Sequence, residues 1–122
     1  MGRDLIEIDE IFLERVYQKV AEIPEGRITT YGKIAELAGY IGAYREVGHA
    51  MSRVTDGKAL PCHRVVNKSG ELAPHHAFGG KERQRRMLMD EGITFLKDGA
   101  IDMDRHMWPE EERWEQMSLF NL

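Results

Sequence analysis

The sequence contains a single cysteine, Cys62, and this scarcity excludes two kinds of small protein. One thiol cannot form an internal disulfide, and a zinc site built from several cysteines is excluded as well. No apolar run approaches the length that spans a bilayer, and residues 1–7 lack the basic-then-apolar layout of a signal peptide. We therefore expect a protein of the reducing cytoplasm.

A general excess of positive charge is also missing, because the net charge is −4, yet the charges are unevenly distributed. Residues 45–86 carry 9 basic and 4 acidic side chains, whereas residues 87–122 carry 3 basic and 9 acidic ones. A locally basic surface attracts a polyanion such as DNA whatever the total charge. The alternative is a solvated surface with scattered Lys and Arg.

The 122 residues fit one domain, and the spacing of apolar positions predicts mainly helices. A first helix is expected over residues 10–23. Thr29 or Thr30 suits the cap of a second helix that ends at Gly39, and a third helix follows over residues 44–53. Two short helices joined by a glycine-bearing turn predict a helix-turn-helix.

The second half of the chain is expected to add a small β element. Residues 64–67 favour a short strand, residues 81–91 a basic helix, and residues 93–107 a small two-stranded or irregular cap. The adjacent His75 and His76 project differently, which favours an exposed loop over a metal site. We expect no metal.

The third predicted helix combines small residues with arginines, since Gly48 and Ala50 stand beside Arg45 and Arg53. Small residues let a helix approach a surface closely, and arginine supplies charge and reach. The alternative is a tight contact between two helices inside the protein.

Cys62 is preceded by Pro61 and followed by His63, an arrangement that suits a nucleophile. A thiol attacks as the thiolate, and a neighbouring imidazole is a common group for removing its proton near neutral pH. The alternative is a lone cysteine that serves only as a small apolar side chain.

Several motifs in this order resemble the O6-alkylguanine-DNA alkyltransferase family. They lie within residues 10–95 and are Tyr31, Arg45-Glu46-Val47-Gly48, Leu60-Pro61-Cys62-His63-Arg64-Val65-Val66-Asn67, Gly70, Gly79-Gly80 and Glu91-Gly92. The resemblance is to the C-terminal domain of the full-length enzymes, and it comes close to the small alkyltransferase-like proteins, which usually carry tryptophan where this chain has Cys62. It implies a mainly α fold with a small β element, a winged-helix-like helix-turn-helix DNA-binding domain over residues 1–107.

The resemblance implies a single-turnover reaction on an extruded base, without a cofactor. Cys62 would take the alkyl group, His63 would accept the thiol proton through a water, and Glu91 would hold His63. Tyr31 would stand beside the flipped guanine and donate toward the leaving purine. The third helix would enter the minor groove, with Arg45 filling the gap left by the extruded nucleotide.

The resemblance further assigns two sets of residues. The expected DNA-binding set is Arg45, Gly48, Ala50, Met51, Arg53 and Arg64. The expected lesion pocket is Tyr31, Met51, Cys62, Val65, Phe78 and Gly79. The chain departs from the family pattern at Val54-Thr55-Asp56, where an Asn is usual, at Ala77-Phe78, where Tyr-Ser is common, and at Gln84, where Lys is common.

Residues 108–122 are expected to form an acidic linker and a C-terminal peptide. Gln116, Leu119 and Phe120 are similar to the short peptide by which bacterial repair proteins dock on the sliding clamp. In that peptide the Gln anchors by hydrogen bonds and the Leu-Phe pair fills an apolar pocket. The sliding clamp is therefore an expected partner.

The sequence predicts a bacterial DNA-repair protein that flips O6-alkylguanine in double-stranded DNA and transfers the alkyl group irreversibly to Cys62. Such a protein is a methylated-DNA–protein-cysteine methyltransferase. One alternative is a non-enzymatic lesion sensor that recruits other repair proteins, such as those of nucleotide excision repair. A second is a helix-turn-helix DNA-binding module whose Cys62 is structural. We expect a monomer that does not bind membranes.

Overall fold

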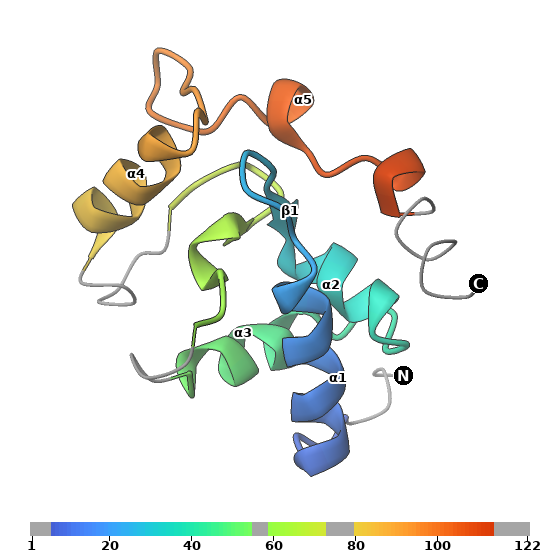
Figure 1. Cartoon of the computed structure of the whole chain (residues 1–122). Helices are drawn as coiled ribbons and strands as arrows, with labels where there is room; N and C mark the ends of the chain where they lie inside the picture. The colour runs from blue at the N-terminus through green and yellow to red at the C-terminus, as the bar shows by residue number, and fades with distance from the viewer. Residues whose placement is uncertain (1–5, 55–58, 73–79, 114–122) are drawn as a thin grey trace.

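A computed structural model describes residues 6–54, 59–72 and 80–113 of the chain. Its elements in chain order are α1 (Glu10–Ala21), β1 (Thr29–Thr30), α2 (Tyr31–Leu37), α3 (Tyr44–Ser52), the 3₁₀ helix η1 (Cys62–Arg64), β2 (Val65–Val66), α4 (Lys81–Asp90) and α5 (Met103–His106). The fold is mainly helical with one small sheet, which confirms the predicted fold class (Figure 1).

Helix α1 is the first predicted helix, and it packs against both α2 and α3. It begins after Asp9, whose Oδ1 accepts a hydrogen bond from the amide N of Phe12 at 2.9 Å. Phe12, Val16 and Val20 recur every four residues and are fully buried. This stripe attaches α1 to the core.

Helices α2 and α3 form the predicted helix-turn-helix. The hydroxyl of Thr30 accepts a hydrogen bond from the amide N of Lys33 at 3.1 Å, so Thr30 caps α2 as expected. Gly39 has a φ of +95°, a conformation that favours glycine, and it turns the chain away from the helix. α3 then packs on α2 through its buried Val47 and Ala50.

The two short strands join segments that are far apart in the sequence. β1 and β2 are parallel, with Thr29 opposite Val65 and Thr30 opposite Val66. The crossover between them contains α2 and α3. Because α2 begins directly after β1 and η1 ends directly before β2, this pairing fixes the start of α2 relative to the cysteine segment.

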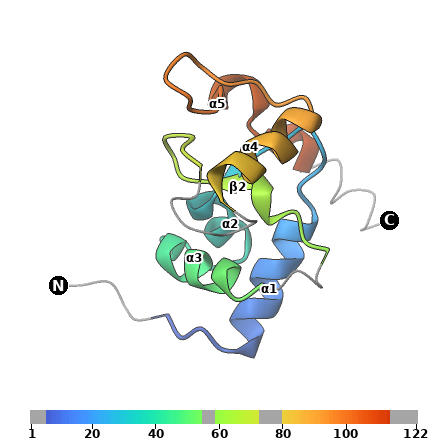
Figure 2. The same cartoon turned by 90° about the vertical axis from the view of Figure 1, so that its left-hand side faces the viewer.

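The hydrophobic core consists of two clusters on either side of the η1–β2 segment. The first includes Phe12, Val16, Val20, Ile34, Val47, Ala50, Cys62, Val65 and Trp108. The second includes Ile28, Val66, Leu72, Leu88, Ile93 and Ile101. In Figures 1 and 2, α1, α2 and α3 lie on one side of this segment and α4 and α5 on the other.

Residues after 107 pack on the domain at least as far as Arg113. Trp108 is buried in the first cluster, and its carbonyl accepts a hydrogen bond from Arg113 at 2.6 Å. The Arg27 guanidinium binds both carboxylate oxygens of Glu112. The expected boundary between residues 107 and 108 stays a prediction, and the expected clamp peptide lies outside the described residues.

The segment expected to form a cap contains one isolated antiparallel bridge, between Phe95 and Ile101. It also contains α5, a short helix that the sequence pattern did not predict. Within residues 6–54, 59–72 and 80–113, no helix has both the length and the apolar character needed to cross a membrane.

Candidate functional site around Cys62

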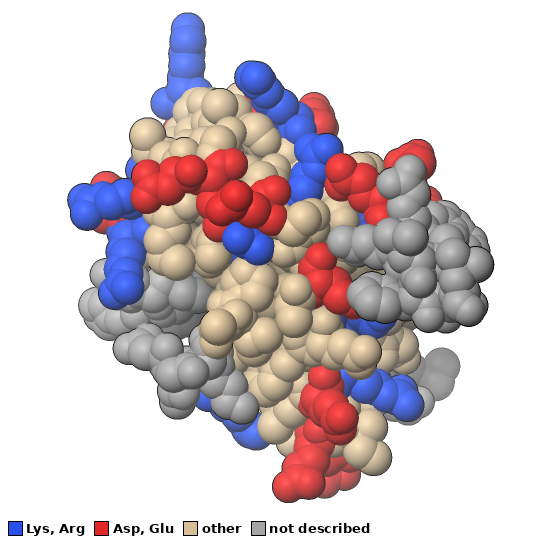
Figure 3. Space-filling view, viewed as in Figure 1, with Lys and Arg blue, Asp and Glu red and all other residues tan. Residues whose placement is uncertain are grey.

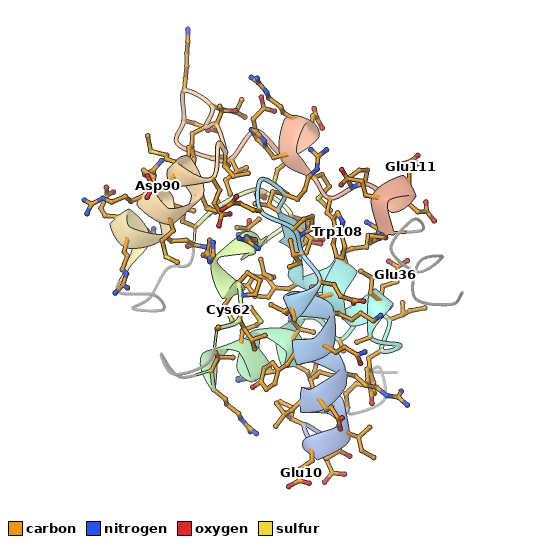
Figure 4. All side chains as sticks on the ribbon, in the orientation of Figure 1. Glu10, Glu36, Cys62, Asp90, Trp108 and Glu111 are labelled. Carbon is orange, nitrogen blue, oxygen red and sulfur yellow. The ribbon has the colours of Figure 1, made fainter. Side chains whose placement is uncertain are left out.

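The thiol of Cys62 is buried at the start of η1. Its amide N donates to the carbonyl of Leu60 at 2.8 Å, so the backbone turns tightly around Pro61. The residue is only 4% exposed and belongs to the first core cluster, and Figure 4 places it between η1 and α3. Burial raises the pKa of the Cys62 thiol to about 11. At neutral pH the thiol of the free protein is therefore protonated.

His63, the residue that follows Cys62 in η1, forms a buried pair with Glu91. Nε2 of His63 lies 2.8 Å from Oε2 of Glu91, and the two side chains are 9% and 10% exposed. An ionised carboxylate can only accept, so in the neutral imidazole Nε2 carries the hydrogen and Nδ1 is left as an acceptor. An imidazole held in this tautomer can take a proton, as a general base requires.

Arg64 holds the Glu91 carboxylate from the other side. Its Nε donates to Oε1 at 2.9 Å and its second terminal nitrogen to Oε2 at 2.6 Å. The remaining nitrogen donates to the carbonyl of Ile23 at 2.8 Å. Burial acts to raise the pKa of Glu91, but the hydrogen bonds from Arg64 and His63 outweigh it and leave the pKa below its ordinary value. Glu91 therefore stays ionised.

Arg64 is consequently misplaced in the expected DNA-binding set. All three of its nitrogens donate within the protein, and its side chain is only 15% exposed. The reason is the short 3₁₀ turn, which puts three consecutive residues on different sides of η1. The sequence pattern alone presents Arg64 as one more basic residue near the motif.

Gln84 is a further member of this network. It is fully buried on α4, and its amide Nε2 donates to the main-chain carbonyl of His63 at 3.1 Å. In the sequence, Gln84 stands out only as a departure from a family pattern. One sequence signal could have indicated that Gln84 is buried: it precedes the apolar Leu88 by four residues, so both lie on the same side of a helix. In the structure α4 buries Gln84 and Leu88 and leaves Met87 half-buried.

Two tyrosines approach the thiol from α2 and α1. Tyr31 is the first residue of α2, and burial, with a smaller effect from Cys62, raises the pKa of its hydroxyl. Tyr17 donates to the carbonyl of Ala50 at 2.6 Å, and burial followed by Cys62 raises its pKa too. Both hydroxyls remain protonated and can donate hydrogen bonds.

The outer face of α3 carries two of the other expected DNA-binding residues, Arg45 and Gly48. Arg45 is exposed there, and Arg53 is exposed at the C-cap of the helix. A Cβ built on Gly48 would meet nothing within 4 Å, so the absence of a side chain at this position is not explained by a contact between helices. Met51 is half-buried.

Ala50 is the second misplaced residue of the expected set. It is fully buried in the first core cluster, so its side chain faces the protein interior. Two positions along an α-helix correspond to a rotation of about 200° about its axis, so Gly48 and Ala50 point to nearly opposite sides. Of the expected lesion pocket, Val65 is buried, whereas Phe78 and Gly79 lie outside the described residues.

The basic region of the sequence is divided between the interior and the surface. Arg64 lies inside, whereas Lys81, Arg83 and Arg86 are exposed on α4. On the face seen in Figure 3, acidic side chains occupy the centre and the lower end, and several Lys and Arg project at the left and upper margins. Within residues 6–54, 59–72 and 80–113, no group of three or more His, Cys, Asp and Glu side chains is placed to hold a metal.

The raised pKa of Cys62 predicts how the rate of thiol alkylation in the free protein depends on pH. Only the thiolate reacts with iodoacetamide, so the alkylation rate should keep rising between about pH 8 and 10, where an ordinary cysteine of pKa about 8.5 levels off. Mass spectrometry follows the reaction without ambiguity because the chain has one cysteine. A rate that levels off below about pH 10, as that of an ordinary cysteine does, would contradict a thiol pKa near 11.

The chain is similar in sequence and in fold to known proteins. The family model described as "6-O-methylguanine DNA methyltransferase, DNA binding domain" matches residues 11–93. A DNA base-flipping protein of Escherichia coli K12 is 43% identical over 103 residues, which are 84% of this chain and 78% of that protein. A methylated-DNA–protein-cysteine methyltransferase of Mycobacterium leprae is 43% identical over 79 residues, 65% of this chain and 46% of that protein. The crystal structure of S. pombe Atl1 in complex with damaged DNA containing O6-carboxymethylguanine has a TM-score of 0.73 at 32% identity, covering 83% of this chain and 97% of that one.

The fold and the matched region define a helix-turn-helix DNA-binding domain with a buried cysteine in its core. More narrowly, the chain belongs to the 6-O-methylguanine DNA methyltransferase family, whose members include both alkyltransferases and alkyltransferase-like proteins. The resemblance inferred from the sequence motifs is thereby confirmed.

Proposed function

We propose that this protein binds duplex DNA at an O6-alkylguanine, rotates the damaged base out of the stack and transfers its alkyl group to Cys62. The observation that carries the proposal is the buried pair, at 2.8 Å, between Glu91 and His63, the residue that directly follows the sole cysteine. A cysteine with only a structural role does not require an adjacent imidazole held in the accepting tautomer.

The proposed transfer is a single displacement. Nδ1 of His63 takes the thiol proton through a water, and Sγ of Cys62 attacks the alkyl carbon. A carbon–sulfur bond forms while the bond from that carbon to guanine O6 breaks and its electron pair stays on the purine. The purine recovers a proton, for which the Tyr31 hydroxyl is the proposed donor, and the proton on His63 restores the balance through solvent. The product is normal guanine and an S-alkylated protein, so each molecule reacts once.

DNA recognition is assigned to the outer face of α3. Gly48 lets the helix backbone approach the minor groove, Arg45 fills the space vacated by the extruded nucleotide, and Arg53 contacts phosphate. The structurally similar Atl1 was crystallised in complex with damaged DNA, which supports a damaged duplex as the partner of this chain.

A second candidate function is lesion sensing without transfer. It is favoured by the raised pKa of Cys62, about 11, because a neutral thiol is a weak nucleophile. The names of two relatives, a DNA base-flipping protein and an alkyltransferase-like protein, favour it as well. A sensor of this kind would hold the flipped base and recruit other repair proteins, while the sliding clamp and excision-repair partners stay predictions.

Intact-mass measurement after incubation with a duplex that contains O6-methylguanine separates these functions. Transfer predicts that the protein gains the mass of one methyl group in stoichiometric yield and that Cys62→Ala gains none. Lesion-selective binding of the wild-type protein without a mass gain would establish the sensor instead. Equal affinity for modified and unmodified duplexes would reject both and leave a DNA-binding module with a structural cysteine.

A further inference from the structure

Tyr44 and Arg45 form an exposed pair at the first turn of α3. The guanidinium carbon of Arg45 lies 5.7 Å from the centroid of the Tyr44 ring, and Tyr44 is 50% exposed. Consecutive side chains on a helix normally diverge. The arginine has therefore folded back over its neighbour's ring, a geometry that gives a cation–π contact.

The Tyr44 ring also borders a cavity of about 380 Å³. The other residues that line the cavity are Thr30, Tyr31, Gly32, Asn67, Lys68 and Ser69. Tyr44 thus contacts Arg45, the proposed filler of the emptied stack, and lines the same cavity as Tyr31, the proposed neighbour of the flipped base.

We propose that Tyr44 is a positioning residue for base flipping that acts through Arg45. The inference rests on the proposed function, because it gives Arg45 the task of filling the stack. A free arginine side chain samples many rotamers and loses most of them when it enters a base stack. The Tyr44 ring removes part of that freedom beforehand and holds the guanidinium on the outer face of α3, so less entropy is lost when DNA binds.

The exposure of the ring supports this role over a structural one. A half-exposed tyrosine at the first turn of a helix adds little to the core, in which Val47 and Ala50 hold α3. The helix has no side-chain cap at Ala43, so Tyr44 is not part of a capping arrangement either. What the ring does contact is the guanidinium of Arg45.

A double-mutant cycle tests the inference. The affinities of wild type, Tyr44→Ala, Arg45→Ala and the double variant are measured for an O6-methylguanine duplex and for the unmodified duplex at one salt concentration. A fluorescent base analogue beside the lesion reports extrusion. In Tyr44→Ala the affinity ratio of modified to unmodified duplex should fall about 3- to 30-fold, the range for exposed to desolvated cation–π contacts. The double variant should be no worse than Arg45→Ala alone, and Tyr44→Phe, which keeps the ring, should stay within about 2-fold of wild type.

The other possible results contradict either this inference alone or the proposed function as well. An unchanged ratio in Tyr44→Ala, losses that multiply in the double variant, or a Tyr44→Phe variant as poor as Tyr44→Ala would overturn this inference alone. A wild-type protein without preference for the lesion would overturn the proposed function and this inference with it. Thermal unfolding of each variant confirms that the comparison is between folded proteins.

Discussion

Replacing Arg64 by Ala is expected to lower the free energy of unfolding by about 3 kcal/mol, because the substitution leaves a buried carboxylate without its principal partner. Arg64 makes two hydrogen bonds to Glu91 and one to the carbonyl of Ile23. Breaking a buried ion pair costs about 3–5 kcal/mol, and we expect the lower value because the Arg64 and Glu91 side chains are 15% and 10% exposed. Urea unfolding at neutral pH measures the loss.

The pH dependence of stability checks independently that the loss comes from the unpaired Glu91 carboxylate. The folded-state pKa of Glu91 is lowered, so its contribution to stability is present above the ordinary carboxyl pKa of about 4.3 and is lost as the pH falls through the lowered value. Arg64→Ala removes the hydrogen bonds and the positive charge through which Arg64 lowers this pKa, while burial continues to raise it. The stability difference between the variant and wild type should therefore narrow in acid.

A control variant and an alternative outcome make the Arg64 experiment decisive. Arg83 is exposed on α4, and Arg83→Ala should change stability by less than about 0.5 kcal/mol. If Arg64→Ala were equally harmless to folding but weakened DNA binding, Arg64 would be a phosphate contact after all. The internal pairing with Glu91 would then not be its role.

The network around His63 shows where sequence patterns stop being informative. The motif around Cys62 and the distant Glu91 were recognisable, and the structure brings His63 and Glu91 to 2.8 Å. The residues that hold this pair in place were not recognisable from the sequence. Arg64 binds Glu91 from within the 3₁₀ turn, and Gln84 binds the carbonyl of His63 from the neighbouring helix α4. The directions in which the Arg64 and Gln84 side chains point depend on tertiary packing, which no local sequence pattern encodes.

Secondary structure was largely predictable because its signals are local. The Thr30 cap and the Gly39 stop mark α2, and the four-residue spacing of apolar side chains marks α1. The β1–β2 pairing was not predictable, since each strand is only two residues long and its partner is more than thirty residues away. α5 is a single turn that periodicity cannot reveal.

The assignment of both Gly48 and Ala50 to one surface was an avoidable error. Helical geometry turns about 100° per residue, so positions two apart lie on opposite sides. Val47 and Ala50, three apart, share the buried side, and Gly48 lies on the outer face with Arg45. Helical periodicity within α3 is a local property of the sequence, and it is sufficient to separate the interior alanine from the outward-facing glycine.

Leu in place of Gly48 is expected to leave folding intact and to weaken DNA binding about 5- to 150-fold, the equivalent of about 1–3 kcal/mol for forcing bulk into a close contact. Within the protein the new side chain meets open space, because a Cβ at this position has no neighbour within 4 Å. Leu is also the better helix former, so the free energy of unfolding should rise by up to about 1 kcal/mol. Against the floor of a minor groove the same side chain would hold the helix backbone away.

Two matched variants isolate the effect of Gly48→Leu. Gln18 is exposed on α1, and Gln18→Leu adds similar apolar surface without touching α3, so its DNA affinity should equal that of wild type. Ala50→Leu puts the same side chain into the core, where overpacking should destabilise the fold by about 1–3 kcal/mol. Fluorescence anisotropy with modified and unmodified duplexes at fixed salt measures binding. A folded Gly48→Leu protein that binds both as tightly as wild type would show that this face of α3 is not the one that meets DNA.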